Sequence, residues 1–234
     1  MKKLKILGFI PAKGSSRGLK NKNMLTFSNK PLIFHSIELC KKIKNVTPFV
    51  STDSNKILKF AKKNKINFDY IRPKKLSNSK SNVVDAILHS LKWFEKKNLV
   101  FDLILLLQPT SPLRDLKTVN KALRLFQRKK LSSLISVTKV KEHPYDCVEV
   151  LNKNWKFLKK NPNKNLNRQG YKKNFYFVDG SFYITSTNFL KKNKKLTIEN
   201  KTQIYITQSN VNNDIDNFED FKITETLFKL KKKI

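Results

Sequence analysis

The stretch IPAKGSSRGLKNKN, residues 10–23, follows a short apolar run at residues 4–10. It places small residues, including Gly14 and Gly18, among the basic side chains of Lys13, Arg17 and Lys22. Glycines let backbone N–H groups approach an anion, and the cations neutralise its charge. The stretch matches neither the Walker loop nor the Gly-x-Gly-x-x-Gly pattern. Taken alone, it predicts a buried strand that ends in a polyanion-binding loop, with an ordinary solvated loop as an equal alternative.

Outward from this stretch, apolar residues alternate between strand-like runs and helical spacing. We expect helices at residues 31–43, 55–64, 81–97 and 116–128, and strands at residues 46–51, 66–71, 100–107 and 134–138. The run at residues 100–107 is the most hydrophobic and suits a central parallel strand buried on both faces. This alternation predicts an α/β fold with a doubly wound, mostly parallel sheet and a ligand crevice at the carboxyl ends of its strands.

The pattern changes after residue 140. Residues 147–158 are typical of a hairpin, and residues 161–174 are polar and without periodicity, as expected of a lid, an arm onto a neighbouring subunit or a loose excursion. Strands at residues 175–185 and 203–207 and a helix at residues 218–230 close the chain. Because no domain boundary is evident, we expect a single domain over residues 1–234 with an inserted hairpin or arm at residues 140–175.

Composition bounds the class of protein. The 234 residues are 39% hydrophobic, which suffices for a packed core. No apolar run approaches the roughly 18 residues of a membrane span, and the first residues do not resemble a signal peptide. We therefore expect a cytoplasmic protein without membrane insertion. Cys40 and Cys147 are far apart and are expected to be inert core thiols.

The charge is strongly basic, with 50 lysine and arginine residues against 17 acidic residues and a net charge of +33. Such a balance is expected of a nucleic-acid-binding protein. However, the lysines are spread along the whole chain and accompany abundant asparagine, isoleucine and phenylalanine, all of which have AT-rich codons. We favour a compositional origin for the charge and expect no specific nucleic-acid partner.

Three later groups carry polar chemistry. LQPTSPLR, residues 107–114, presents polar side chains after the central strand, although Ser111 alone would also explain it as a helix cap. DGSFYI, residues 179–184, begins a strand with a carboxylate and a glycine. Asp214 and Asp216 alternate onto one side of an extended segment, a spacing that suits a divalent cation bridging to phosphate. A simpler explanation of the pair is an N-cap for the following helix.

Together these stretches resemble the acylneuraminate cytidylyltransferases, which make CMP-activated sialic acid and related nonulosonates. The resemblance rests on residues 10–23, Ser51-Thr52-Asp53, Arg72-Pro73, LQPTSPLR, Arg168-Gln169, DGSFYI and the late Asp-x-Asp, which occur in the family's order. It implies a Rossmann-like nucleotidyltransferase domain with a small dimerisation excursion. The implied reaction is attack by the anomeric hydroxyl of a nonulosonic acid on the α-phosphate of CTP, which releases pyrophosphate.

The resemblance also assigns residues to roles. The catalytic group would be Lys22, Arg17, Asp214 and Asp216. The nucleotide would be bound by Ala12, Lys13, Gly14, Ser15, Arg17, Lys22, Asn23, Ser81 and Asn82. The sugar acid would be bound by Gln108, Arg168, Gln169, Asp179 and Tyr183. Asp214 and Asp216 would hold Mg²⁺, with Mn²⁺ as an alternative, and the enzyme would be a homodimer.

Two departures from the family pattern affect these roles. The usual loop has arginine at the position of Lys13 and lysine at that of Arg17, so the two cations are exchanged and their division of labour is open. His143-Pro144 is followed by Tyr145 and not by the usual basic residue, so the contact from a neighbouring subunit is also open. The alternatives are a cytidylyltransferase for the eight-carbon lipopolysaccharide sugar acid and a non-catalytic nucleic-acid-binding protein.

Overall fold

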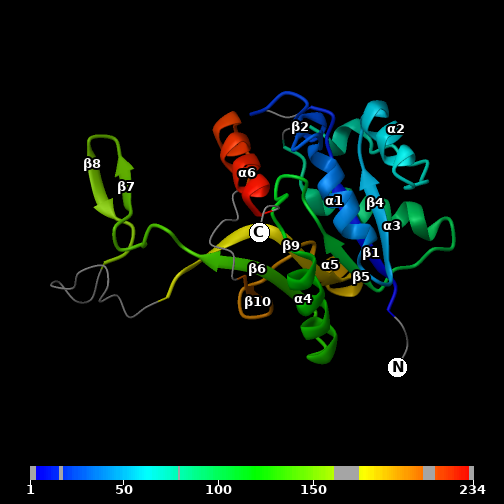
Figure 1. The fold of residues 1–234 in the computed structure, drawn as a ribbon. Coiled ribbons are helices and arrows are strands. Elements are labelled where there is room, and N and C mark those ends of the chain that lie inside the picture. Colours follow the sequence, from blue (N-terminus) through cyan, green and yellow to red (C-terminus); the bar gives the residue numbers. More distant parts are fainter. Residues whose placement is uncertain (1–3, 16–17, 79, 161–173, 208–213, 232–234) are drawn as a thin grey trace.

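A six-stranded sheet forms the centre of the molecule, in the order β10-β6-β9-β5-β1-β4 (Figure 1). The computed structural model describes residues 4–15, 18–78, 80–160, 174–207 and 214–231. The strands are β1 (Ile6–Pro11), β4 (Val46–Ser51), β5 (Leu103–Leu106), β6 (Ser133–Lys139), β9 (Tyr176–Ser186) and β10 (Gln203–Ile206). β1 pairs in parallel with β4 and β5, and β10 with β6, whereas β9 is antiparallel to both of its neighbours. The predicted α/β fold with a mostly parallel sheet is confirmed.

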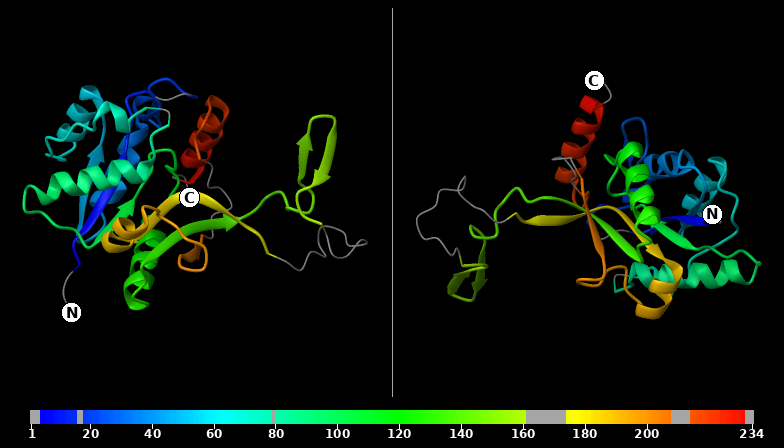
Figure 2. Two further views of the ribbon diagram at one scale, coloured as in Figure 1. Left: turned by 180° about the vertical axis from the view of Figure 1, so that it is seen from behind. Right: turned by 90° about the horizontal axis from the view of Figure 1, so that it is seen from below.

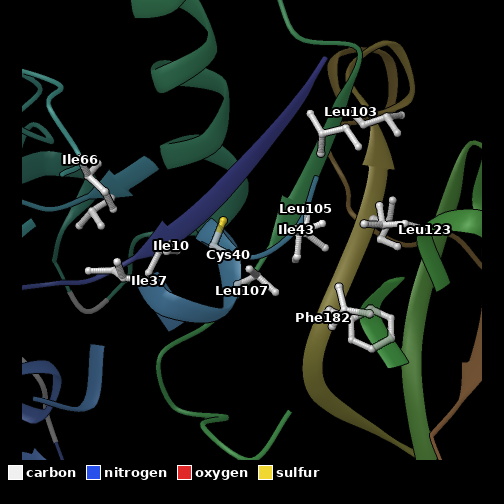
Figure 3. Packing of buried hydrophobic residues seen from close by; sticks show 14 of the residues in the cluster. Ile10, Ile37, Cys40, Ile43, Ile66, Leu103, Leu105, Leu107, Leu123 and Phe182 are labelled. Atoms are coloured by element: carbon white, nitrogen blue, oxygen red, sulfur yellow. The ribbon is translucent and has the colours of Figure 1, made fainter. Parts of the chain in front are cut away.

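Helices cover both faces of the sheet because successive strand residues point to opposite sides. On β1, Ile6 and Ile10 join one core cluster, and Leu7 and Phe9 join the other. The first cluster includes α1 (Leu32–Lys41), α2 (Asn55–Lys63) and α4 (Leu116–Arg128), and Figure 3 shows its packing around Cys40 and Leu105. The second includes α3 (Val83–Glu95) and α5 (Thr187–Asn193). This is the predicted doubly wound arrangement.

One predicted strand is wrong and another is too long. Residues 66–71 form no strand, although Ile66 and Tyr70 are buried as the pattern required. Tyr70 packs against Phe49 and Trp93, so its burial comes from aromatic packing and not from a ladder of hydrogen bonds. The strand predicted at residues 100–107 is the shorter β5, and Val100 is exposed. β5 has a parallel neighbour on one side only, since β9 lies antiparallel on the other.

A two-stranded hairpin stands away from the body in every view (Figures 1 and 2). Its strands are β7 (Val148–Leu151) and β8 (Asn154–Phe157), and the outer parts of β6 and β9 lead to it. This confirms the predicted hairpin; the polar part of the expected arm at residues 161–173 lies outside the described residues. None of the helices in the described part of the chain has the length and apolar character needed to cross a membrane.

The last helix, α6 (Phe218–Lys231), packs against the segment that follows the first loop. That segment contains the short elements η1 (Lys22–Met24), β2 (Thr26–Phe27) and β3 (Lys30–Pro31). Phe27 meets Phe221 and Phe228 edge to face, and Ser28 N donates to Glu225 Oε1 at 2.8 Å. Ile215 is buried in the same cluster. This packing therefore places the Asp-x-Asp segment beside the first loop, although the two are nearly 200 residues apart in the sequence.

Candidate functional site

A cavity of about 480 Å³ lies where the parallel strands β1 and β5 end, as expected for a parallel sheet. The end of β1, the loop after it and the loop after β5 form part of its wall, and the segment 72–83 forms the rest. Its lining residues are Pro11, Lys13, Ser15, Lys22, Asn23, Arg72, Leu76, Ser77, Asn78, Ser81, Asn82, Val83, Gln108, Pro109 and Thr110. Three of these side chains, Lys13, Lys22 and Arg72, are cationic, so the described wall favours an anionic ligand.

The first loop is held in place by bonds to its backbone. Gly14 N donates to Asp53 Oδ1 at 2.8 Å, directly after β4, and Asn23 Nδ2 donates to Lys13 O at 2.9 Å. Lys13 Nζ reaches across the cavity to Asn78 O at 2.8 Å. Asn23 and Ala12 are buried behind the loop, while Ser15 faces the cavity. Arg17, the other predicted cation, lies outside the described residues.

Lys22 connects this loop to the Asp-x-Asp segment. Its Nζ donates to Ile215 O at 2.5 Å and lies 3.4 Å from Asp216 Oδ1. The Lys22 side chain is 13% exposed and that of Asp216 is 80% exposed, so the lysine is held in the wall and the carboxylate faces solvent. Gly18 makes the approach sterically feasible, because a Cβ placed on it would lie 2.2 Å from Asp216 O. Two segments predicted to share a ligand are thus in contact.

The two aspartates do not cap α6. That role belongs to Asn217, whose Oδ1 accepts from Asp220 N at 2.8 Å, and to Asp220, whose Oδ2 accepts from Asp216 N at 3.0 Å and from Asn217 N at 3.1 Å. The simpler explanation of the pair from sequence is therefore wrong. Neither the Asp214 nor the Asp216 carboxylate takes part in this cap, to which Asp216 contributes only its backbone N–H.

The environment of Asp214 suits a cation. Its Oδ1 atom is buried and has no hydrogen-bond partner among the described residues. Burial raises the pKa of Asp214, and a hydrogen bond from Thr110 opposes this rise. An orphaned carboxylate oxygen beside a second carboxylate is a good ligand for a hard divalent cation. Within the described ranges, no three His, Cys, Asp or Glu side chains gather to hold a metal, so such an ion would need further oxygen ligands.

Beside Asp214, β9 and the loop after β5 form a second polar wall. Gly180 has a φ of +66°, and a Cβ placed on it would lie 3.8 Å from both Gln108 Oε1 and Asp214 Oδ2. Ser111 Oγ donates to Gly180 O at 3.3 Å, so Ser111 ties these elements together and does not cap the following helix. Asp115 caps that helix instead. Tyr183 is half-buried on β9, and its pKa is raised by burial and then by the charge of Asp214.

The predicted sugar contacts divide into three groups. Gln108 and Tyr183 lie near Asp214, as expected for one site. Arg168 and Gln169 lie outside the described residues. Asp179 is only 1% exposed, and its carboxylate accepts hydrogen bonds from Ser136 Oγ, Ser181 N and Thr207 Oγ1. In this structure Asp179 therefore holds β6 and β9 together at the bulge beside Gly180, and its contact with the sugar acid stays a prediction.

Ser81 and Asn82 both line the cavity, at the start of α3. Asn82 Oδ1 accepts from Val84 N at 2.9 Å and caps the helix. Ser81 Oγ donates to Asn78 Oδ1 at 2.8 Å. Their side chains therefore shape the turn at the start of α3.

No role was predicted for Arg72 from the sequence, although Arg72-Pro73 is one of the stretches on which the family resemblance rests. Arg72 is 2% exposed, its Nε donates to Ser51 Oγ at 3.0 Å, and its guanidinium also donates to Ser51 O. Burial lowers its pKa. A single arginine directly before a proline, after an apolar alternation, was the signal that could have pointed to a buried cation in the wall.

Comparison with known proteins identifies relatives across nearly the whole chain. A family model described as "Cytidylyltransferase" matches residues 7–233. The CMP-N,N'-diacetyllegionaminic acid synthase of Legionella pneumophila is 28% identical over 97% of both chains. The post-translational flagellin modification protein B of Campylobacter coli is 31% identical over 97% of this chain and 96% of its own. The pseudaminic acid cytidylyltransferase of Campylobacter jejuni is 25% identical over 97% of both.

A solved structure of CMP:2-keto-3-deoxy-manno-octonic acid synthetase, in complex with CTP, has a TM-score of 0.71 and covers 97% of this chain and 99% of its own. At 15% identity this likeness concerns the fold alone.

Proposed function

The chain belongs to the cytidylyltransferase family, and from this premise we propose that it transfers a CMP group from CTP to a nonulosonic acid. One observation carries the proposal: Lys22 of the first loop lies 3.4 Å from Asp216 of the Asp-x-Asp segment, beside a cavity lined by cations. The anomeric hydroxyl oxygen of the sugar acid bonds to the α-phosphorus. The bond from that phosphorus to the bridging oxygen breaks, pyrophosphate leaves, and the hydroxyl proton passes to solvent.

The nucleotide fits the cavity by charge. Lys13 and Lys22 line it and would neutralise the triphosphate, with Arg17 from the same loop as a further cation. Gly14, Ser15 and Asn23 would place the loop around the phosphates, and Ala12 is buried beneath it. The backbone at Ser81 and Asn82 would contact the cytosine. Positioning and charge neutralisation supply most of the rate enhancement in phosphoryl transfer. The sugar hydroxyl is the nucleophile, so no protein side chain has to act as one.

The acidic side of the site would hold the metal. Asp214 and Asp216 are the residues for Mg²⁺, or Mn²⁺ as an alternative, because Asp214 offers a buried oxygen without a hydrogen-bond partner among the described residues. When bound, such an ion neutralises phosphate charge and lowers the pKa of the attacking hydroxyl. Lys22 keeps the segment of Asp214 and Asp216 against the first loop through its bond to Ile215 O.

The sugar acid would lie against Gln108 and Tyr183, on the wall next to Asp214. Arg168 and Gln169, which lie outside the described residues, stay predicted contacts of the sugar acid, because a guanidinium matches two carboxylate oxygens. Relatives named for legionaminic and pseudaminic acids support a nine-carbon acid as the substrate class.

The function is tested with purified protein, CTP and Mg²⁺, and pyrophosphate release as the measured quantity. N-acetylneuraminate, legionaminate, pseudaminate and the eight-carbon lipopolysaccharide acid are supplied separately. We expect turnover with at least one nine-carbon acid and little with the eight-carbon acid. Silence with every nonulosonate, together with steeply salt-dependent binding to RNA, would instead favour the nucleic-acid-binding alternative.

We further propose that the enzyme is a homodimer joined through the hairpin. Val148 lies opposite Phe157, and Val150 opposite Trp155, so these four side chains share one face. All four are exposed. The other face carries the ion pair between Lys156 and Glu149 at 3.0 Å. A two-stranded hairpin with one apolar face is marginal on its own in water, and a second copy would bury that face.

Trp155→Asp is expected to convert the dimer into a monomer, because it places a charge on the apolar face. Light scattering after size-exclusion chromatography measures the mass. Lys156→Gln, on the opposite face of the same strand, is the matched control and should remain dimeric. An unchanged mass for Trp155→Asp, or a monomeric wild type, would contradict this assembly.

A further inference from the structure

We propose that Arg114 is a positioning residue that fixes the sugar-acid side of the site by holding the backbone carbonyl of Gln108. This inference rests on the proposed function. Arg114 ends the LQPTSPLR stretch and is 8% exposed, and it does not line the cavity. Its two terminal nitrogens diverge: Nη1 donates to Ser36 Oγ at 2.9 Å, and Nη2 donates to Gln108 O.

The Gln108 carbonyl is the centre of a small network. Besides Arg114, it accepts from Ser111 N at 3.3 Å and from Ser36 Oγ at 3.5 Å. It precedes Pro109, which has no backbone N–H, so few backbone bonds are available to hold this turn. Arg114 therefore closes the loop onto its own start and ties it to α1 through Ser36. The orientation of the Gln108 carbonyl fixes where its side chain leaves the backbone.

The loop that Arg114 closes contacts the acidic side of the site at several points. Gln108 Oε1 and Asp214 Oδ2 both lie 3.8 Å from a Cβ placed on Gly180. Thr110 O accepts from Ile215 N at 3.0 Å, which joins the loop to the Asp-x-Asp segment. A shift of this turn would consequently move the Gln108 amide relative to Asp214. Lys13 and Lys22 lie on the first loop and η1, which the guanidinium of Arg114 does not contact among the described residues.

Burying the charged guanidinium of Arg114 carries a desolvation penalty, so good packing alone does not explain why an arginine is present here. Its Nε has no hydrogen-bond partner, and no carboxylate oxygen lies within 4 Å of it, among the described residues. Burial lowers the pKa of Arg114 to about 10, so Arg114 stays charged at neutral pH. Among the carboxylates, Asp214 has the largest electrostatic effect on Arg114. An apolar side chain would pack here without this desolvation penalty. Unlike an apolar residue, Arg114 supplies two hydrogen-bond donors near Asp214.

The test measures steady-state kinetics of Arg114→Gln with CTP and the acceptor that the wild type uses. We expect the KM for the sugar acid to rise by about 10- to 100-fold, as for other residues that orient a ligand-binding group, while the KM for CTP stays within about twofold. Arg114→Lys keeps the charge but offers one donor atom in place of two, so we expect it to recover part of the loss. Arg124→Gln, on the exposed face of α4, is the matched control and should behave as wild type.

A purely structural role would lower the melting temperature and leave the two KM values in their wild-type ratio. That result, or equal increases in both KM values, would overturn the proposal. If Arg114→Gln does not fold, Arg114→Lys and Ser36→Ala are judged by the same ratio. An inactive wild type would contradict the proposed function, whereas an active wild type with an unchanged ratio in the variants would contradict only the role of Arg114.

Discussion

The Asp214→Asn protein is expected to lose at least about a thousandfold in kcat while its metal-free form melts at a higher temperature than wild type. The loss of activity follows because asparagine removes the charge that would hold a divalent cation. The gain in stability follows from the buried Oδ1 atom, which has no partner among the described residues, and from the raised pKa of Asp214. Pyrophosphate release and calorimetry measure the two effects.

The pH dependence gives this prediction a sign. Because burial raises the pKa of Asp214 in the folded protein, the ionised carboxylate disfavours folding, and its contribution to stability falls as pH rises from the ordinary aspartate range through the raised pKa. The difference in melting temperature between variant and wild type should therefore be full at neutral pH and shrink in acid. Glu219→Gln, an exposed acid on α6, is the control and should keep both activity and melting temperature. A fully active Asp214→Asn would remove the metal assignment.

Lys22→Met is expected to reduce kcat/KM by roughly a hundredfold or more, as does the loss of one preorganised donor to developing negative charge in other enzymes. The lysine is 13% exposed and connects the first loop to the Asp-x-Asp segment, so its removal takes a cation from the triphosphate and a bond from Ile215 O. The protection against thermal unfolding that CTP and Mg²⁺ give should fall in parallel.

Lys20→Met is the matched control for Lys22, because Lys20 lies in the same loop and does not line the cavity. It removes the same charge from the protein, and we expect wild-type kinetics within about twofold. If both variants lost activity equally, the effect would come from net charge and not from the position of Lys22.

The fold was largely predictable from the sequence because burial and periodicity agree in most elements. Ile6 and Ile10 on one face of β1, and Leu7 and Phe9 on the other, are what a strand buried on both faces requires. The failure at residues 66–71 has a definite cause. Tyr70 shows strand-like burial because it packs in an aromatic cluster, and periodicity cannot distinguish this from pairing in a sheet.

The site was predictable in its charges but not in its supporting groups. Lys22 and Asp216 meet as expected, since each belongs to a recognisable stretch. Asp179 looked equally like a ligand contact in the sequence. In the structure its carboxylate accepts hydrogen bonds from Ser136 and Thr207, which are remote in the sequence. Arg114 donates to Ser36 and to Gln108, and these two residues also come from different elements. Which polar group binds a ligand and which holds its neighbours depends on tertiary contacts that spacing does not encode.

The most direct test is a crystal structure of the protein with CTP and Mn²⁺, in which anomalous scattering locates the metal. The account predicts that the triphosphate lies in the cavity beside Lys13 and Lys22, and that the metal is bound by Asp214 or Asp216. A nucleotide bound elsewhere, with no metal at Asp214 or Asp216, would contradict it.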